Sequence, residues 1–227
     1  MIFFLDELAS NTPALIVYLS AFGVAFVTGI GFHEFSHAWA ANELGDDTAA
    51  RQGRLTLNPI KHLDPMGTAL LLLVGFGWGK PTPVNPYRLR NGVQRGNMMV
   101  AVAGPLSNFV FAAIAALPFQ VGIVDPISSV GSIADASGQE LVALFLFFII
   151  YINIVLGVFN LIPIFPLDGF KVVQGVMPAP IAMQFERLSQ WGPALLIGLL
   201  ALGFMTPYNP LGWFIGGIGS IVFELIT

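Results

Sequence analysis

Two histidines and a glutamate stand in the stretch "GIGFHEFSHAWAANELGD", residues 29–46, at the end of a long apolar run. Because His33 and His37 are four residues apart, a helix places them on one face, one turn apart. Two imidazoles in this arrangement can bind one Zn²⁺, and Glu34 beside them can accept a proton from water. The spacing therefore predicts a metal centre with a neighbouring general base.

The same three residues also allow a structural interpretation, in which two hydrogen-bonded core histidines accompany a structural glutamate. A buried glutamate needs a partner or must become neutral, and an apolar segment offers few partners. A metal cluster accounts for His33, Glu34 and His37 together, so we favour it.

Two ligands do not complete a catalytic zinc site, which usually has three protein ligands and one open position. The third histidine of the chain, His62, lies in the basic loop sequence "NPIKHLDP". We expect it to be a surface or loop residue rather than a ligand.

Asp168 in "FNLIPIFPLDGF" is a better candidate for the third ligand. Pro163 and Pro166 cannot continue a regular helix, so they break the preceding apolar segment near the end at which His37 is expected. Gly169 permits a sharp turn after the aspartate. Taken alone, Asp168 would be interpreted as a surface aspartate in a turn at the end of a helix.

The composition places these residues in a membrane protein. Of the 227 residues, 56% are hydrophobic and 10% are charged, and the mean hydropathy is +0.79. Soluble domains carry roughly a quarter charged residues. The net charge of −4 argues against a nucleic acid partner. The absence of cysteine excludes disulfides and thiolate ligands.

Apolar stretches of about 20 residues indicate membrane-spanning helices. Together they predict an α-helical polytopic membrane protein with about five transmembrane helices. The expected spans are Pro13 to Leu44, Gly96 to Pro118, Glu140 to Ile162, and a C-terminal pair at 189–205 and 211–226. The short, glycine-rich segment Pro65 to Lys80 is predicted to be a re-entrant or β-like segment between spans one and two rather than a sixth span.

The basic residues orient these spans. All nine lie within 51–95 and 171–187, whereas the loop 120–139 has no Lys or Arg. Loops rich in Lys and Arg stay in the cytoplasm, so we expect the N-terminus outside, the C-terminus in the cytoplasm and the metal centre toward the cytoplasmic side, in a cell membrane. The basic segments could also contact anionic lipids on that same face.

Three motifs in order, "HEFSH", "AGPLSN" and "NLIPIFPLDG", resemble the site-2 protease family of intramembrane zinc metalloproteases. The segments "NPIKHLDPMG" and "GWGKPTPVNP" are also similar to that family, so the resemblance covers roughly Gly29 to Gly169. It implies one protease domain, 1–227, with a catalytic core at about 13–178 and a helix pair at about 189–226. The form is minimal, with no PDZ or nucleotide-binding module visible.

The resemblance implies one Zn²⁺ per chain, held by His33, His37 and Asp168, with Glu34 as the base. Asn108 and Asn160 match asparagines of the family motifs. They would hydrogen-bond the substrate backbone or the tetrahedral intermediate, or equally make polar contacts between helices. Asn153 matches no motif and is expected to pack between helices.

The expected reaction is hydrolysis of a peptide bond within or near the cytoplasmic end of a transmembrane helix of a protein substrate in the lipid bilayer. The alternative is a non-catalytic polytopic protein or a transporter with a structural zinc site. A transporter should show repeated halves or paired broken helices, and neither is evident in the sequence. A zinc protease of the prenyl-protein type would take a glutamate from a later helix as its third ligand, whereas Asp168 in "LDG" favours the site-2 type.

Overall fold

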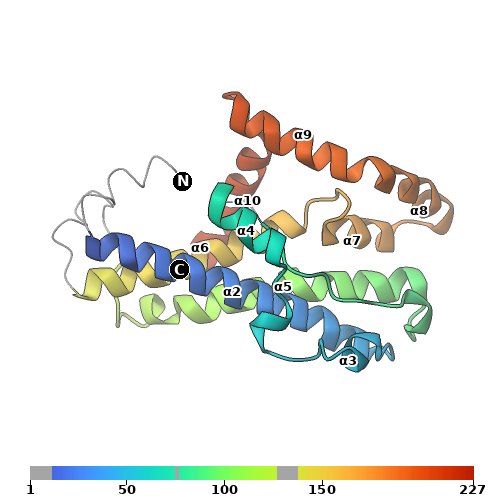
Figure 1. Cartoon of the computed structure of the whole chain (residues 1–227), viewed down its shortest axis with the longest axis horizontal. Coiled ribbons are helices and arrows are strands. Elements are labelled where there is room, and N and C mark those ends of the chain that lie inside the picture. The colour runs from blue at the N-terminus through green and yellow to red at the C-terminus, as the bar shows by residue number, and fades with distance from the viewer. Residues whose placement is uncertain (1–11, 75–76, 127–137) are drawn as a thin grey trace.

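The computed structural model describes residues 12–74, 77–126 and 138–227 (Figure 1). Three long helices, α2 (Thr12–Glu43), α5 (Val93–Gln120) and α6 (Gly138–Asn160), pack against one another along the long axis of the molecule. Each is apolar and long enough to cross a membrane. The first three predicted spans are therefore confirmed, while residues 1–11 and most of the loop 120–139 lie outside the described residues.

Small residues allow the three helices to approach closely. Ala21 and Ala25 on α2 and Ala112 and Ala116 on α5 are completely buried, and alanine at a contact lets two helix backbones come near each other. Gly45 ends α2 with a φ of +100°, a conformation that glycine adopts without strain.

Four short helices connect α2 to α5: α3 (Thr48–Arg51), η1 (Pro59–Lys61), α4 (Pro65–Val74) and η2 (Pro86–Arg88). The ten residues of α4 span about 15 Å at ~1.5 Å per residue, half of a hydrocarbon core. After α4 the chain returns toward the beginning of this helix, where an isolated β-bridge pairs Gly79 with Leu63, just before α4.

This out-and-back path agrees with the re-entrant interpretation of Pro65 to Lys80. The β-like alternative is wrong for Pro65–Val74, which are helical. In the part of the chain that the structure describes, β-pairing is limited to the single Leu63–Gly79 bridge.

After α6, the chain forms α7 (Asp168–Val176), α8 (Ala179–Glu186), η4 (Arg187–Trp191), α9 (Gly192–Met205) and α10 (Pro210–Ile226). The stretch Ala179–Met205 is a fourth apolar candidate span, and α10 is a shorter apolar helix of 17 residues. Figure 1 shows α8 and α9 along one side of the bundle formed by α2, α5 and α6.

The helix α10 runs antiparallel to α6. Leu211 near its start belongs to the same buried cluster as Ile162 and Leu167, at the junction of α6 and α7. Nearer its end, the ring of Phe223 lies 5.6 Å from that of Phe147, in the first half of α6. The chain therefore travels from the α6–α7 junction to the opposite end of the bundle within α10.

The C-terminus lies at the end of the bundle where α5 ends. The side-chain amide of Gln120 donates to the carbonyl of Ile226 at 2.5 Å. The end of α5, where the loop 120–139 begins, therefore lies at the same end of the molecule as the C-terminus, whereas we expected that loop and the C-terminus on opposite sides of the membrane. The helix α9 alone has 14 residues and extends about 21 Å, less than a hydrocarbon core of about 30 Å, so a crossing here would need the whole stretch Ala179–Met205, which includes α8 and η4.

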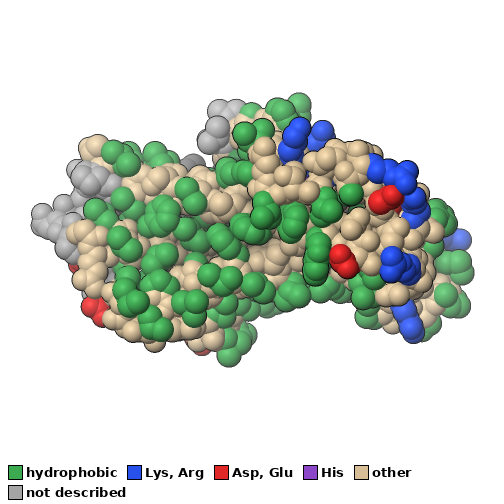
Figure 2. Space-filling model, turned by 90° about the horizontal axis from the view of Figure 1, so that it is seen from below, with side chains coloured by type: hydrophobic (Ala, Val, Ile, Leu, Met, Phe, Trp, Pro, Cys, Tyr) green, Lys and Arg blue, Asp and Glu red, His purple; other side chains and the backbone are tan. Residues whose placement is uncertain are grey.

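Basic residues gather at one end of the molecule. Figure 2 shows hydrophobic side chains over most of the visible surface and Lys and Arg side chains at one end. The elements at that end include α3, α8 and the start of α5 (Figure 1). This separation of an apolar surface from a basic end is typical of a membrane protein with one basic face.

Candidate metal centre

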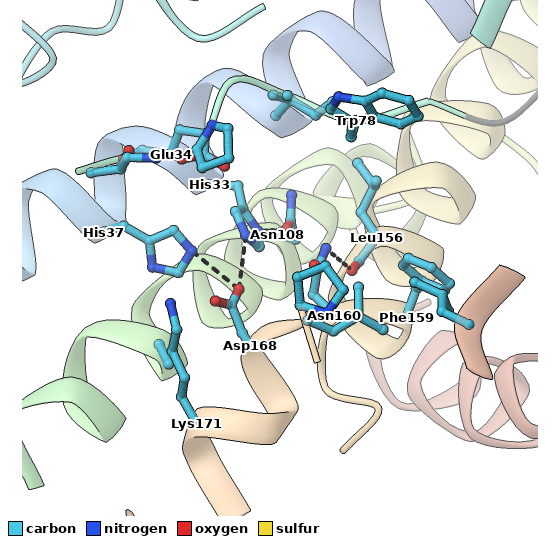
Figure 3. Close-up of a pocket in the computed structure, with 18 of the residues that line it drawn as sticks. His33, Glu34, His37, Trp78, Asn108, Leu156, Phe159, Asn160, Asp168 and Lys171 are labelled. Atoms are coloured by element: carbon cyan, nitrogen blue, oxygen red, sulfur yellow. Dashed lines mark hydrogen bonds and ion pairs between the residues drawn. The ribbon is translucent and has the colours of Figure 1, made fainter. Parts of the chain in front are cut away.

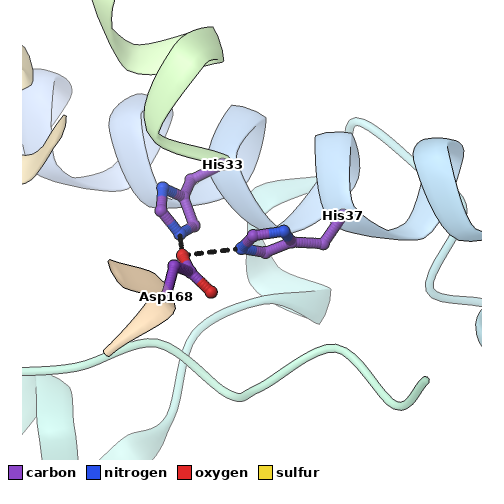
Figure 4. A group of neighbouring side chains, drawn as sticks. All are labelled: His33, His37 and Asp168. Atoms are coloured by element: carbon purple, nitrogen blue, oxygen red, sulfur yellow. Dashed lines mark hydrogen bonds and ion pairs between the residues drawn. The ribbon is translucent and has the colours of Figure 1, made fainter. Parts of the chain in front are cut away.

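The structure brings His33, His37 and Asp168 together (Figure 4). The two histidines lie on successive turns of α2, and Asp168 is the first residue of α7. The Oδ2 atom of Asp168 lies 3.1 Å from the Nε2 atom of each histidine. All three residues are buried, at 7–8% exposure. Residues 135 positions apart in the chain therefore share one small cluster.

Hydrogen bonds fix the orientation of both imidazoles. The Nδ1–H of His37 donates to the backbone carbonyl of Val100 at 2.7 Å. The Nδ1 of His33 lies 2.8 Å from Asn108 Oδ1, and Asn108 Nδ2 donates to the carbonyl of Gly29, so Oδ1 is the accepting atom. Both histidines therefore carry their proton on Nδ1 when neutral and turn an Nε2 lone pair toward Asp168.

Three electron-pair donors thus converge within 4.8 Å of one another. A carboxylate that faces two imidazole lone pairs is repelled by them unless a cation lies between. Two nitrogens and one oxygen are a ligand set that suits Zn²⁺.

Gly104 on α5 leaves room for such an ion. A Cβ atom at this position would lie 2.5 Å from His37 Nε2 and 2.7 Å from His33 Nε2. Any side chain at residue 104 would therefore fill the space in front of the two ligand atoms. The residue belongs to "AGPLSN", but its role was not predicted because a glycine in an apolar helix has no chemical signature.

The break after α6 carries Asp168 into place. The helix ends at Asn160, and short turns through Pro163 and Pro166 lead to α7. The sharp turn that we expected at Gly169 is not formed, because the chain is helical from Asp168 onward and the φ of Gly169 is not positive. Instead, a Cβ there would lie 2.1 Å from the carbonyl oxygen of Leu161. Glycine thus lets α7 begin directly against the end of α6.

Glu34 lies in the same cavity but is not part of the three-residue cluster (Figure 3). One carboxylate oxygen, Oε2, accepts the backbone N–H of Thr82 at 2.8 Å. The hydroxyl of Thr82 donates to the backbone carbonyl of Glu34 at 2.9 Å. The predicted base therefore stands beside the cluster, where it is held by the chain that returns after α4.

The cavity has a volume of about 460 Å³. It lies between α2, the returning segment 77–84, α5, α6, α7 and α9. Its lining residues include Trp78, Leu156, Phe159, Lys171 and Leu200. A mostly apolar cavity with a few polar groups beside a ligand cluster is a typical site for a substrate segment.

The three asparagines differ in their surroundings. Asn108 is completely buried, and its Nδ2 donates to Gly29 O at 3.0 Å and to Asn153 Oδ1 at 3.1 Å. With His33 bonded to its oxygen, Asn108 fits the interhelical alternative rather than substrate binding. Asn153 packs between helices, as expected. Asn160 lines the cavity, and its Nδ2 donates to Leu156 O at 2.9 Å.

His62 is not near the cluster. Its Nε2–H donates to the carbonyl of Thr56 at 2.7 Å, and Arg54 lies beside its Nδ1. It is a loop residue, as predicted, but it is completely buried rather than at the surface. Loop composition alone did not reveal that the loop folds back on itself and covers this side chain.

Two comparisons with known proteins agree on one family. The model of peptidase family M50 matches residues 120–199, which include Asp168. The chain is 38% identical over 191 residues to the candidate zinc metalloprotease YwhC of Bacillus subtilis, covering 81% of this chain and 80% of YwhC. It is 27% identical over 199 residues to the candidate zinc metalloprotease Rip2 of Mycolicibacterium smegmatis, covering 85% of this chain and 72% of Rip2. No solved structure matches the chain significantly.

Proposed function

Because this chain belongs to peptidase family M50, the site-2 protease family, we propose that it is an intramembrane zinc protease. Its substrate is a membrane protein, and it hydrolyses a peptide bond within or near the cytoplasmic end of a transmembrane helix of that protein. The relatives YwhC and Rip2 are named as zinc metalloproteases, which agrees with this proposal.

The observation that carries the proposal is the convergence of His33, His37 and Asp168 on the space that Gly104 leaves open. These three residues would hold one zinc ion. A structural zinc site is usually closed by four protein ligands, whereas a catalytic site keeps a position open for water or substrate. Three candidate ligands beside a cavity of about 460 Å³ favour the catalytic kind over a structural zinc site.

When bound, zinc supplies Lewis acidity that acidifies a water molecule and polarises a peptide carbonyl. Glu34 acts as the general base, accepts the proton of the attacking water and passes it to the leaving amine. Val100 and Asn108 keep the two imidazoles oriented through their Nδ1 atoms. Asn160, in the cavity wall, is the remaining candidate to hydrogen-bond the substrate backbone.

The basic end of the molecule suggests the orientation in the membrane. We assign the end with α3, α8 and the start of α5 to the cytoplasm because Lys and Arg collect there. Since Gln120 contacts Ile226, the end of α5 and the C-terminus then both lie on the outer side, together with the start of α2. The metal centre, near the end of α2, lies toward the cytoplasmic side.

The test is metal analysis of the purified protein together with cleavage of a single-span substrate. We expect one zinc per chain, lost on replacement of His33, His37 or Asp168 by alanine. Glu34→Gln should keep the zinc and abolish cleavage, because Glu34 is a base and not a ligand. Cleavage by Glu34→Gln at the wild-type rate would show that this mechanism is wrong.

His62→Ala serves as the control for the third ligand. It removes a buried histidine of the same chemistry that lies away from the cluster, so the folded fraction should keep its zinc. If His62→Ala lost the metal and Asp168→Ala retained it, the third ligand would be misassigned.

A further inference from the structure

Glu34 is hydrogen-bonded to the short segment Pro81–Thr82–Pro83. Because proline has no N–H to donate, Thr82 is the one residue of this segment with a backbone N–H. The N–H of Thr82 donates to Glu34 Oε2 at 2.8 Å, while the Thr82 hydroxyl donates to the Glu34 backbone carbonyl at 2.9 Å. One residue thus contacts both the carboxylate and the backbone of the candidate base.

The buried side chain of Arg54 also holds this segment. The guanidinium of Arg54, only 5% exposed, donates to the carbonyls of Pro81 and Lys80. The Lys80 N–H donates to the carbonyl of His62 at 2.7 Å. These contacts fix the backbone of Lys80 and Pro81, directly before Thr82.

The segment is held beyond Thr82 as well. The carboxylate of Asp46, completely buried, accepts the N–H of Asn85 at 2.6 Å. Gly79 lets the chain pass close to α2, since a Cβ there would lie 2.6 Å from a methyl carbon of Ile30. The N–H of Thr82 is thereby fixed relative to α2 from both directions along the chain. The proposed reaction assigns no role to Asp46, Arg54 or His62.

We propose that Thr82 is a positioning residue for Glu34: its backbone N–H fixes one carboxylate oxygen and so leaves the other oriented to take the proton of the attacking water. This inference rests on the proposed function, in which Glu34 is the base. A glutamate side chain has several rotatable bonds, and an error of about 1 Å in a reacting group can cost about 100-fold in rate. A fixed N–H from a segment stiffened by two prolines limits that error.

The discriminating variant is Thr82→Pro, which deletes the N–H. Thr82 precedes Pro83 and is therefore already restricted to an extended backbone that suits proline. In the zinc-loaded full chain, we expect kcat for a single-span substrate to fall about 10- to 100-fold. Zinc content should equal that of the wild type, and KM should stay within about threefold, since substrate binding does not use this N–H.

Thr82→Val is the matched variant, because it keeps the N–H and loses only the hydroxyl. We expect its kcat to exceed that of Thr82→Pro by at least about threefold, because the N–H to Glu34 is retained. Should Thr82→Pro not yield folded protein, the same measurements are made on a chain with an ester in place of the Pro81–Thr82 amide. The ester removes the N–H while keeping the side chain and the backbone path.

Three results would overturn the positioning role. The first is a kcat equal to that of the wild type in the variant that lacks the N–H. The second is a kcat above that of the wild type, which would mean that the contact restrains the enzyme. The third is a loss of zinc, which would mean that Thr82 acts on the metal centre. Glu34→Gln, measured in parallel, separates this failure from a failure of the proposed function. If Glu34→Gln is inactive and Thr82→Pro is fully active, only the positioning role is rejected.

Discussion

At the scale of single residues, the candidate metal centre depends on the atoms that orient the three proposed ligands as much as on those ligands. The Val100 carbonyl and the Asn108 amide set the orientation of the two histidines. Gly104 keeps the space in front of their Nε2 atoms open. Because such supporting groups tune metal affinity, their loss should weaken zinc binding even though none of them is a ligand.

Gly104→Ala tests the space for the ion directly. The added methyl group would lie 2.5 Å from His37 Nε2, and both imidazoles are held by hydrogen bonds, so they cannot easily move aside. Overpacking of this kind costs about 1–3 kcal/mol, which corresponds to a roughly 5- to 150-fold weaker zinc affinity. The measurement is zinc competition with a chelator of known affinity.

Gly23→Ala is the matched control, because a Cβ at Gly23, also within a membrane span, would meet nothing within 4 Å. It should bind zinc as the wild type does. Equal affinity in both variants would show that the space at Gly104 is not where the metal binds.

The sequence was informative about the three proposed metal ligands. It was uninformative about the residues that orient them or keep the space between them open. The spacing of His33 and His37 predicted the shared face, and the proline break predicted the position of Asp168. Gly104, Val100 and Thr82 could not be predicted, because a glycine contact, a backbone carbonyl and a backbone N–H leave no chemical mark on the residue type.

At the scale of elements, the site depends on the junction of α6 and α7. The helix α7 begins at Asp168, directly against the last turn of α6, and Gly169 makes this approach possible. The prolines of "IPIFP" could be read as a helix break from the sequence. The close packing of two backbones at Gly169 could not, because we expected glycine there to serve a turn.

Gly169→Ala should displace the start of α7 and with it the third ligand. A Cβ at this position would lie 2.1 Å from Leu161 O and 2.5 Å from Ile162 O, and backbone atoms cannot rotate away as a side chain can. We expect the thermal midpoint to fall by several degrees, consistent with about 1–3 kcal/mol of overpacking, together with partial loss of zinc.

The control for this junction is Gly138→Ala at the start of α6, where a Cβ would meet nothing within 4 Å. Its melting temperature and zinc content should match the wild type. A Gly169→Ala protein that also matched the wild type in both measurements would contradict the packing argument.

The segment Pro65 to Lys80 shows a limit of sequence reasoning at this scale. A short apolar run with glycines suits a strand, a re-entrant turn or a short helix equally, because periodicity cannot separate them over about ten residues. The structure forms α4 and then returns to pair Gly79 with Leu63. That return places Thr82 beside Glu34, a contact that no pattern in the sequence predicts.

At the scale of the whole molecule, hydropathy predicted the spans but not the path of the C-terminal helices. Gly192 approaches Phe165 at the start of α9, and Leu211 at the start of α10 packs with Ile162. The chain therefore leaves the α6–α7 junction in α9 and returns to it before α10. Hydropathy cannot distinguish a helix that leaves this junction and returns to it from a helix that crosses the membrane, because both helices are apolar.

This path leads to a prediction about topology. Reporter tags after Thr227 and within the loop 120–139 should lie on the same side of the membrane, because Gln120 contacts Ile226. A tag within residues 45–92, at the basic end, should lie on the other side, which we assign to the cytoplasm. Cytoplasmic signals from both the Thr227 tag and the 45–92 tag would contradict this arrangement.

The depth of the site in the bundle determines where a substrate is cut. From Thr12 to His33, α2 advances about 30 Å at ~1.5 Å per residue, and a hydrocarbon core is about 30 Å thick. If α2 enters the membrane near Thr12, the metal centre lies toward the cytoplasmic side. The scissile bond of a substrate helix must then be presented at the same depth.

A peptide bond within a helix is shielded, because its carbonyl is hydrogen-bonded to the N–H four residues further on. The substrate must therefore unwind locally before its carbonyl can be polarised in the cavity. We expect cleavage near the cytoplasmic end of a substrate helix, promoted by Gly, Pro or Asn close to the bond, since these residues weaken helices. Mass spectrometry of the two fragments locates the cut. A cut in the outer third of the helix, or faster cleavage of an uninterrupted poly-leucine span, would show that neither depth nor unwinding governs the reaction.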